Sequence, residues 1–139
     1  MTLNASAHSV PGTLQQVVVV AGRHMLTTDE PESLGGDDTA AAPHELVAAA
    51  LAACVSTTLV MFARTKDWDL GEVHVDVEFD HRATPRRFEV EISLDGDLDA
   101  AQVERLERVA ATCPVKRSFE AGAEFVEHIK LLQNEGGSR

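Results

Sequence analysis

Aromatic side chains are scarce in this sequence, which has five Phe, one Trp and no Tyr among 139 residues. The core must therefore be built mostly from Val, Leu, Ala and Ile. The chain is long enough for one domain, residues 1–139, and too short for two ordinary ones. Because a short chain with few large side chains buries a limited apolar area, it has reason to bury more by forming oligomers.

An excess of positive charge is also missing, since 12 Lys and Arg residues stand against 23 Asp and Glu, for a formal net charge of −11. Nucleic-acid binding through phosphates needs a basic surface, and an acidic chain avoids anionic membranes. We find no apolar run of the roughly 18–20 residues that span a bilayer, and residues 1–10 lack the pattern of a signal peptide. We therefore expect a cytoplasmic protein without nucleic-acid or membrane partners.

Motifs for metal ions and phosphates are absent as well. The two cysteines, Cys54 and Cys113, form no Cys-x-x-Cys pair, the His residues have no ligand spacing, and no Gly-rich phosphate loop occurs. We expect neither a metal nor a cofactor. A reducing compartment disfavours a permanent structural disulfide, which makes the pair of thiols the feature of interest.

The hydrophobic patterning that is present predicts an α+β fold. β-branched residues predict the first strand, and strict alternation predicts two antiparallel strands in the second half. The expected elements are a frayed or extended segment 1–13, a strand over 14–23 that continues past Gly22 to residue 26, a loop over 29–38, a helix from 43 to about 66, strands over 73–79 and 88–94, a helix over 99–112, a turn or short helix over 115–120, a strand over about 123–132 and a disordered tail 134–139.

The long helix is the most distinctive of these elements. Pro43 is well placed at its first position, and Glu45 falls in the first turn, where a negative charge suits the helix dipole. Residues 46–62 are nearly all apolar or small, and a helix without a clear polar face is usually buried. We therefore expect a buried helix with Cys54 at its middle.

Cys54 allows two interpretations. A free cysteine often packs in a core as a small hydrophobe, and an apolar environment raises its pKa and makes it inert. A reactive thiolate instead needs a nearby cation or a helix N-terminus. The sequence offers candidate cations without placing them, namely Arg23, His24, Arg64 and Lys66.

Cys113 also allows two interpretations. It precedes Pro114, and a thiol just before the start of a helix receives the positive end of the helix dipole, which lowers its pKa. Lys116 and Arg117 could add to this effect. Alternatively, Cys113-Pro114 only ends the preceding helix and has no reactivity.

Two stretches of the sequence resemble the cysteine motifs of one known family. In the first, Gly35-Gly36 is followed by Pro43-His44-Glu45-Leu46 and then by an Ala-rich run that ends at Cys54. In the second, Leu94-Asp95-Gly96-Asp97-Leu98 is followed by Ala111-Thr112-Cys113-Pro114-Val115. Together they resemble the OsmC/Ohr family, in its OsmC-like branch, and the likeness extends over roughly residues 17–130.

This resemblance implies an intertwined α+β homodimer, with the cysteine-bearing helices at its centre and the active sites at the interface. It implies a thiol peroxidase that reduces organic hydroperoxides without metal or flavin. Cys54 would attack the peroxide, Cys113 would resolve the sulfenic acid as a disulfide, and an external dithiol of the dihydrolipoyl type would reduce that disulfide.

The family's peroxidases also use an arginine beside the thiolate and a glutamate that holds the arginine. Arg23 and Glu45 are the candidates here, and His44 occupies the position at which the family typically has its glutamate. Two alternatives to the peroxidase remain open at this point. One is a non-catalytic dimer of the same fold that binds a small hydrophobic ligand at its interface, and the other is a structural dimer whose cysteines only pack.

Overall fold

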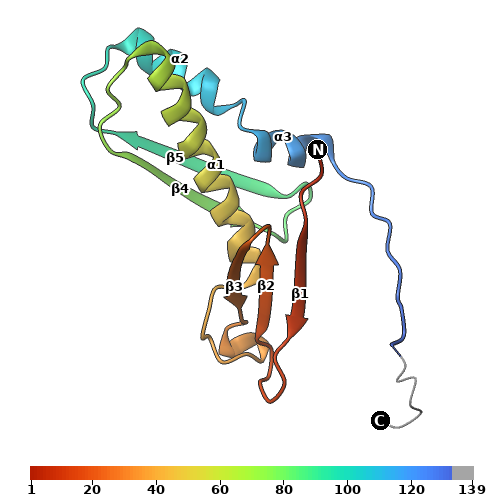
Figure 1. Ribbon diagram of the computed structural model, residues 1–139. Helices are drawn as coiled ribbons and strands as arrows, with labels where there is room; N and C mark the ends of the chain where they lie inside the picture. The colour runs from red at the N-terminus through yellow and green to blue at the C-terminus, as the bar shows by residue number, and fades with distance from the viewer. Residues whose placement is uncertain (133–139) are drawn as a thin grey trace.

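The computed structural model describes residues 1–132 as an α+β arrangement of two antiparallel sheets and three α-helices (Figure 1). The predicted tail 134–139 lies outside the described residues. In chain order the elements are β1 (Ala5–Ser9), β2 (Val17–Ala21), β3 (His24–Thr28), the 3₁₀ helix η1 (Glu32–Leu34), α1 (Pro43–Lys66), β4 (Val73–Asp80), β5 (Arg87–Leu94), α2 (Ala100–Ala110) and α3 (Pro114–Ala121).

The first sheet has the strand order β1-β2-β3, and its strands pack mainly on one another. One expectation is corrected here. The chain does not continue straight past Gly22, because Gly22 has φ of +62° and lies in a two-residue turn that pairs Ala21 with His24 across a hairpin. Of the two alternatives for residues 1–13, frayed or extended, residues 5–9 are extended, since they pair with β2 from Ala5↔Ala21 to Ser9↔Val17.

The loop between β3 and α1 is organised around the buried carboxylate of Asp29, which is 1% exposed. Asp29 accepts hydrogen bonds from the Thr39 hydroxyl at 2.7 Å, the Thr39 N–H at 3.1 Å and the Glu30 N–H at 2.8 Å. A side chain at Gly36 would lie 2.0 Å from the Glu30 carbonyl oxygen, so this turn requires glycine. The Asp29 N–H also donates to the Ala41 carbonyl at 3.2 Å, which closes the loop at its base.

Helix α1 begins at Pro43 and ends at Lys66, as predicted. Within one chain only one of its faces is buried, along Leu51, Val55, Leu59 and Ala63, so the expected burial of the whole helix stays a prediction. On the opposite face the side chains are exposed, at Ala49, Ala50, Ala53, Thr57 and Met61.

The length and composition of α1 also correct the expectation that no segment could span a bilayer. By these two criteria alone α1 is long and apolar enough, with a mean hydropathy of 2.2 in an 18-residue window. The core helices of soluble proteins have the same properties, so this is weak support for a membrane helix. Only 22% of the window is buried within one chain, and the rest of the window is half-buried or exposed.

The core of the chain lies between α1, the β4–β5 hairpin, α2 and α3. The two strands pair from Val73↔Leu94 to Asp80↔Arg87, as their alternation predicted, and their apolar side chains face α1. Asp99 caps α2 through the Gln102 N–H at 2.8 Å, and Leu106 and Val109 of α2 are buried against α1. This half of the molecule therefore holds α1 firmly along one side.

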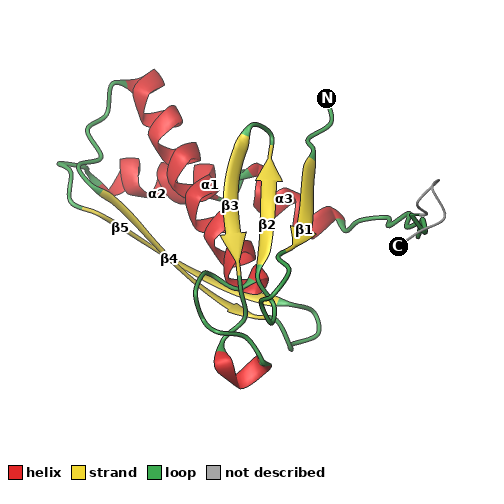
Figure 2. Cartoon of the chain, turned by 60° about the horizontal axis from the view of Figure 1, so that its bottom comes forward, coloured by secondary structure: helices red, strands yellow, loops and turns green. Residues whose placement is uncertain are grey.

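The segment after α3 is not the strand that the sequence predicts over 123–132. It pairs with no strand of the described chain and runs away from the helices (Figure 1). Five large apolar side chains on it are exposed, at Phe125, Val126, Ile129, Leu131 and Leu132. A strand needs a neighbouring edge to supply its hydrogen bonds, and no strand edge of the described residues pairs with residues 123–131. Figure 2 shows the β1–β3 sheet and this segment on the same side of the molecule.

Candidate functional site

The structure brings the two cysteines together. Cys54 lies at the middle of α1 and is partly buried, and Cys113 caps the N-terminus of α3 and is 0% exposed. Both are free thiols, and each is a hydrogen-bond partner of the other. The resemblance implied this pair, whereas their separation in the sequence gave no direct sign of it.

A tight corner between α2 and α3 places Cys113. The Cys113 N–H donates to the Ala110 carbonyl at 3.2 Å, and the Thr112 hydroxyl donates to the Val109 carbonyl at 2.7 Å. Pro114 then begins α3, whose Arg117 N–H donates to the Cys113 carbonyl at 3.0 Å. Because α2 and α3 both pack on α1, the corner between them positions the Cys113 thiol next to Cys54 of α1.

The pKa of Cys54 is lowered. Burial alone would raise the pKa, but hydrogen bonds from the Cys113 thiol, the Val115 N–H and the Thr58 hydroxyl favour the thiolate and outweigh it. The Val115 N–H belongs to the first turn of α3, where unpaired N–H groups carry the positive end of the helix dipole. Cys54 is therefore the thiol of the pair that ionises first.

The pKa of Cys113 is raised, which is the opposite of what its place before a helix predicts. Burial is the largest cause, and the hydrogen bond that its thiol gives to Cys54 is the second. The backbone N–H groups of Lys116 and Val115 act in the other direction but do not prevail. The interpretation that the start of α3 lowers the pKa of Cys113 was therefore wrong, and the thiolate that this helix start favours is that of Cys54.

Two of the groups that lower the pKa of Cys54 were missed from the sequence. Thr58 is one helical turn beyond Cys54, and this i,i+4 spacing is a signal that could have identified it. Val115 acts through its backbone, so its side chain gave no signal.

Arg23 and Glu45 are not brought to the thiols. Arg23 lies exposed in the turn between β2 and β3, and among the described residues no interaction joins it to either cysteine. The Glu45 carboxylate accepts the Ala42 N–H at 3.0 Å and so caps the start of α1. Glu45 and Cys54 are nine positions apart on the helix, about 13 Å along its axis.

Two of the other candidate cations, Lys116 and Lys66, are also directed elsewhere. The Lys116 ammonium pairs with Glu120 at 3.0 Å, and the Lys66 ammonium lies 5.9 Å from the centre of the Phe62 ring. In residues 1–132 no side-chain cation contributes to the pKa shift of either thiol. The thiolate of one chain is therefore supported by hydrogen bonds and the α3 N-terminus alone.

His44 has an unexpected neighbour at the start of α1. Its ring stacks on that of His81, with 4.2 Å between the ring centres, and Phe79 meets both rings edge-on. The sequence gave no reason to join these two histidines. The contact ties the tip of the β4–β5 hairpin to the first turn of α1.

Comparisons with known proteins agree with this fold. Solved structures similar to the chain include a protein of the osmotic-stress and detoxification response from Psychrobacter arcticus, with 25% identity, 84% of this chain and 86% of that one covered, and a TM-score of 0.68. An organic hydroperoxide resistance protein, OsmC, from Legionella pneumophila has 27% identity, coverages of 84% and 88%, and a TM-score of 0.58. An OsmC-like protein from Mycoplasma pneumoniae has 14% identity, coverages of 86% and 88%, and a TM-score of 0.71, which shows the fold alone.

No curated protein matches the chain. The model of the family described as OsmC-like protein matches residues 35–128, which include both cysteines and most of the chain. This match confirms the resemblance seen in the two cysteine motifs, and the chain belongs to the OsmC-like protein family.

Proposed function

We propose that this protein is a thiol-dependent peroxidase that reduces organic hydroperoxides through Cys54 and Cys113. Its family and its likeness to an organic hydroperoxide resistance protein support the substrate class. The observation that carries the proposal is the contact between two free thiols whose pKa values are shifted in opposite directions. One thiol is thereby prepared to attack, and the other keeps its proton until it is needed.

The reaction has three balanced steps. The Cys54 thiolate attacks one oxygen of the O–O bond, which breaks so that the other oxygen leaves with the organic group and takes up a proton as an alcohol. Cys54 is then a sulfenic acid. The sulfur of Cys113 attacks the sulfenic sulfur, water leaves, and a Cys54–Cys113 disulfide forms. An external dithiol, of the dihydrolipoyl type, reduces this disulfide by exchange and becomes a disulfide itself.

The hydrogen bond between the thiols suits this order of events. While Cys54 is a thiolate, Cys113 is the donor that stabilises it, and the raised pKa of Cys113 keeps the proton in place. Once Cys54 has been oxidised, Cys113 is already beside it and needs only to lose that proton. No large movement of the chain is required for the second step.

The proposal includes a homodimer, in which Arg23 and Glu45 would support the thiolate across the interface. Three apolar features of one chain lack cover, namely the Ala49–Met61 face of α1, the half-buried Val17–Val20 run of β2 and the segment 123–131. Exposed apolar surfaces of this extent mark interaction sites. A second copy would cover them and would bring a cation to a site that has none within its own chain.

We place the protein in the cytoplasm, where reduced thiols and dithiol reductants are maintained. In that compartment the Cys54–Cys113 disulfide would be transient, formed by peroxide and removed by the reductant. The free thiols of the structure correspond to the reduced state of this cycle.

Treatment of the reduced protein with one equivalent of cumene hydroperoxide tests the proposal. We expect the loss of both thiols and a fall of about 2 Da in the mass of the chain, because one intramolecular disulfide removes two hydrogens. Peptide mapping should join the peptides that contain Cys54 and Cys113. Two free thiols, an unchanged mass and unconsumed peroxide would contradict the proposal.

A further inference from the structure

A run of aromatic rings crosses the β4–β5 hairpin and ends on α3. Phe79 and Phe88 are partners across the two strands, and their rings are stacked with 4.3 Å between the ring centres. The ring of Phe119, on α3, lies 4.9 Å from that of Phe88, and at the other end Phe79 meets the His44–His81 stack. Because Phe88 packs on the core, Phe119 joins α3 to the body of the molecule.

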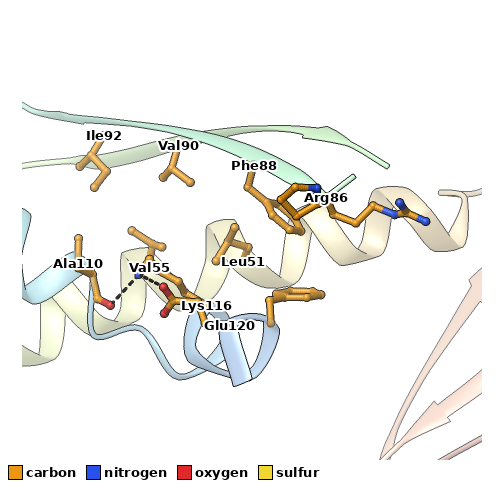
Figure 3. A pocket seen from close by; sticks show the side chains of 12 residues that line it. Leu51, Val55, Arg86, Phe88, Val90, Ile92, Ala110, Lys116 and Glu120 are labelled. Atoms are coloured by element: carbon orange, nitrogen blue, oxygen red, sulfur yellow. Dashed lines mark hydrogen bonds and ion pairs between the residues drawn. The ribbon is translucent and has the colours of Figure 1, made fainter. Parts of the chain in front are cut away.

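The second half of α3 has no other specific tie to a neighbouring element. A pocket of about 650 Å³ lies between β5, α1 and α3, so α3 does not pack directly along β5 (Figure 3). The Lys116–Glu120 ion pair and the hydrogen bond of the Ser118 hydroxyl both stay within the helix, none of whose residues is buried. The Lys116 ammonium also lies 3.4 Å from the Ala111 carbonyl oxygen, at the corner before α3. Among the hydrogen bonds, ion pairs and ring contacts of residues 1–132, only that of Phe119 reaches from the second half of α3 to another element.

The first half of α3 carries the group that matters for the thiol pair. Val115 packs on the core, and its N–H bonds to the Cys54 sulfur. Phe119 follows Val115 by four residues, so the two side chains lie on the same side of the helix, about 6 Å apart along its axis. Two contacts on one side of a short helix fix the direction of its axis, whereas a helix held only at its first turn is free to tilt. A tilt would misalign the Val115 N–H, and a hydrogen bond weakens steeply with angle and distance.

We propose that Phe119 is a positioning residue for Cys54: its ring contact with Phe88 fixes the direction of α3, and α3 in that direction presents the Val115 N–H to the Cys54 sulfur. Phe119 itself contributes to the pKa shift of neither thiol, so its effect passes through the helix. The inference rests on the proposed function, in which the Cys54 thiolate attacks the peroxide. The ionisation of Cys54 is nevertheless measurable without peroxide.

Alkylation of Cys54 by iodoacetamide, followed across pH by mass spectrometry of its peptide, tests the proposal in Phe119→Ala. A weaker hydrogen bond from Val115 raises the pKa of Cys54, so the midpoint of the alkylation rate should move to higher pH. At neutral pH the rate should fall by roughly two- to fivefold, since a hydrogen bond to a charged group is weakened. Well above both midpoints the two rates should converge, because Cys54 is then a thiolate in each protein. An unmoved midpoint, or rates that differ equally at every pH, would overturn the proposal.

Three further variants separate the position of α3 from general damage. Phe119→Tyr keeps the ring, whose residue is 49% exposed and leaves the added hydroxyl open to water, and should restore the unaltered midpoint. Phe119→Leu keeps an apolar side chain without the ring and should move the midpoint in the same direction as Phe119→Ala but less, and it carries the test if Phe119→Ala does not fold. Val90→Ala is the matched control, because Val90 lines the same pocket two residues from Phe88 without a ring contact. An equal shift in Val90→Ala, or no recovery in Phe119→Tyr, would contradict the role of the ring.

A double variant tests whether the effect of Phe119 passes through Phe88. Phe88→Leu should also raise the midpoint, and adding Phe119→Ala to it should change the midpoint little, because the contact is already lost. Fully additive shifts would show that Phe119 does not act through Phe88. The two proposals fail separately. A protein that consumes peroxide but whose midpoint ignores Phe119 loses only this inference, whereas a shifted midpoint without peroxide consumption contradicts only the peroxidase.

Discussion

Cys54 and Cys113 share one contact, yet their two sulfur atoms have different surroundings. Cys54 lies between the buried and exposed faces of α1 and accepts hydrogen bonds from the Cys113 thiol and from Val115 and Thr58. Cys113 is sealed from solvent behind the corner between α2 and α3. The comparison teaches that position at a helix N-terminus does not decide which thiol ionises. The direction in which the N–H groups and the neighbouring thiol donate decides it, together with burial.

The largest effect should come from replacing each cysteine in turn. Cys54→Ser should reduce peroxidase turnover by roughly 10³-fold or more, because it removes the nucleophile. Cys113→Ser should still consume one equivalent of peroxide, after which Cys54 is oxidised further and turnover stops. Rates measured with dithiothreitol, together with the mass of each chain, check both. Full turnover by Cys54→Ser would overturn the assignment of roles.

The second test asks whether the exposed side of Cys54 is covered by another copy. Ala53→Arg places a charge on the uncovered face of α1, one position before Cys54. If that face is a dimer contact, the unpaired charge should shift the protein to monomers and remove most of the activity. Sedimentation or light scattering measures the change in mass, and Ala101→Arg on the exposed side of α2 is the control. Two variants of the same mass and activity would show that this face makes no contact.

The third test removes the donor that distinguishes the two thiols. Cys113→Ala eliminates the thiol hydrogen bond to Cys54, so the pKa of Cys54 should rise from its lowered value. Because only the thiolate reacts with iodoacetamide, the alkylation rate of Cys54 should reach its midpoint at a higher pH than in the unaltered protein. At neutral pH the alkylation should be several times slower. A midpoint that stays in place would mean that Cys113 does not stabilise the thiolate.

The smallest effect should come from Thr58→Val, which removes a hydroxyl donor and keeps the shape of the side chain. The Thr58 hydroxyl is the weakest of the three groups that lower the pKa of Cys54, so the alkylation midpoint should rise less than in Cys113→Ala. Thr57→Val, on the exposed face, provides the matched control. A larger change in Thr57→Val than in Thr58→Val would contradict this account of the site.

Much of the fold could be predicted because its signals are local. The start of α1 at Pro43, the alternation of β4 and β5, and the cap of α2 at Asp99 each depend on residues within a few positions. The turn at Gly22 was missed because a single glycine with positive φ looks the same in sequence as a glycine within a strand. The segment 123–132 has the composition of a strand, but composition does not supply the neighbouring edge.

The candidate site was predicted less completely, and for a related reason. The cysteines and the family were recognisable from two short motifs. The direction of the pKa shifts was not, because it depends on which donors point at which sulfur. A backbone N–H at Val115 has no signature in the sequence, and burial of Cys113 results from the packing of α2 and α3 on α1. That Arg23 and Glu45 support the thiolate of a second copy stays a prediction.

The hydrogen bond from the Asp29 N–H to the Ala41 carbonyl has a consequence for the first sheet. This bond joins the residue after β3 to Ala41, and the next residue, Ala42, is the N-cap of α1. The two ends of the loop between β3 and α1 are therefore held together, and the loop does not act as a flexible linker. The orientational freedom of β1–β3 relative to α1 is then reduced within each chain. A surface that is already held in place has less entropy to lose when it associates, so this single hydrogen bond at the base of a loop would favour the homodimer that we propose.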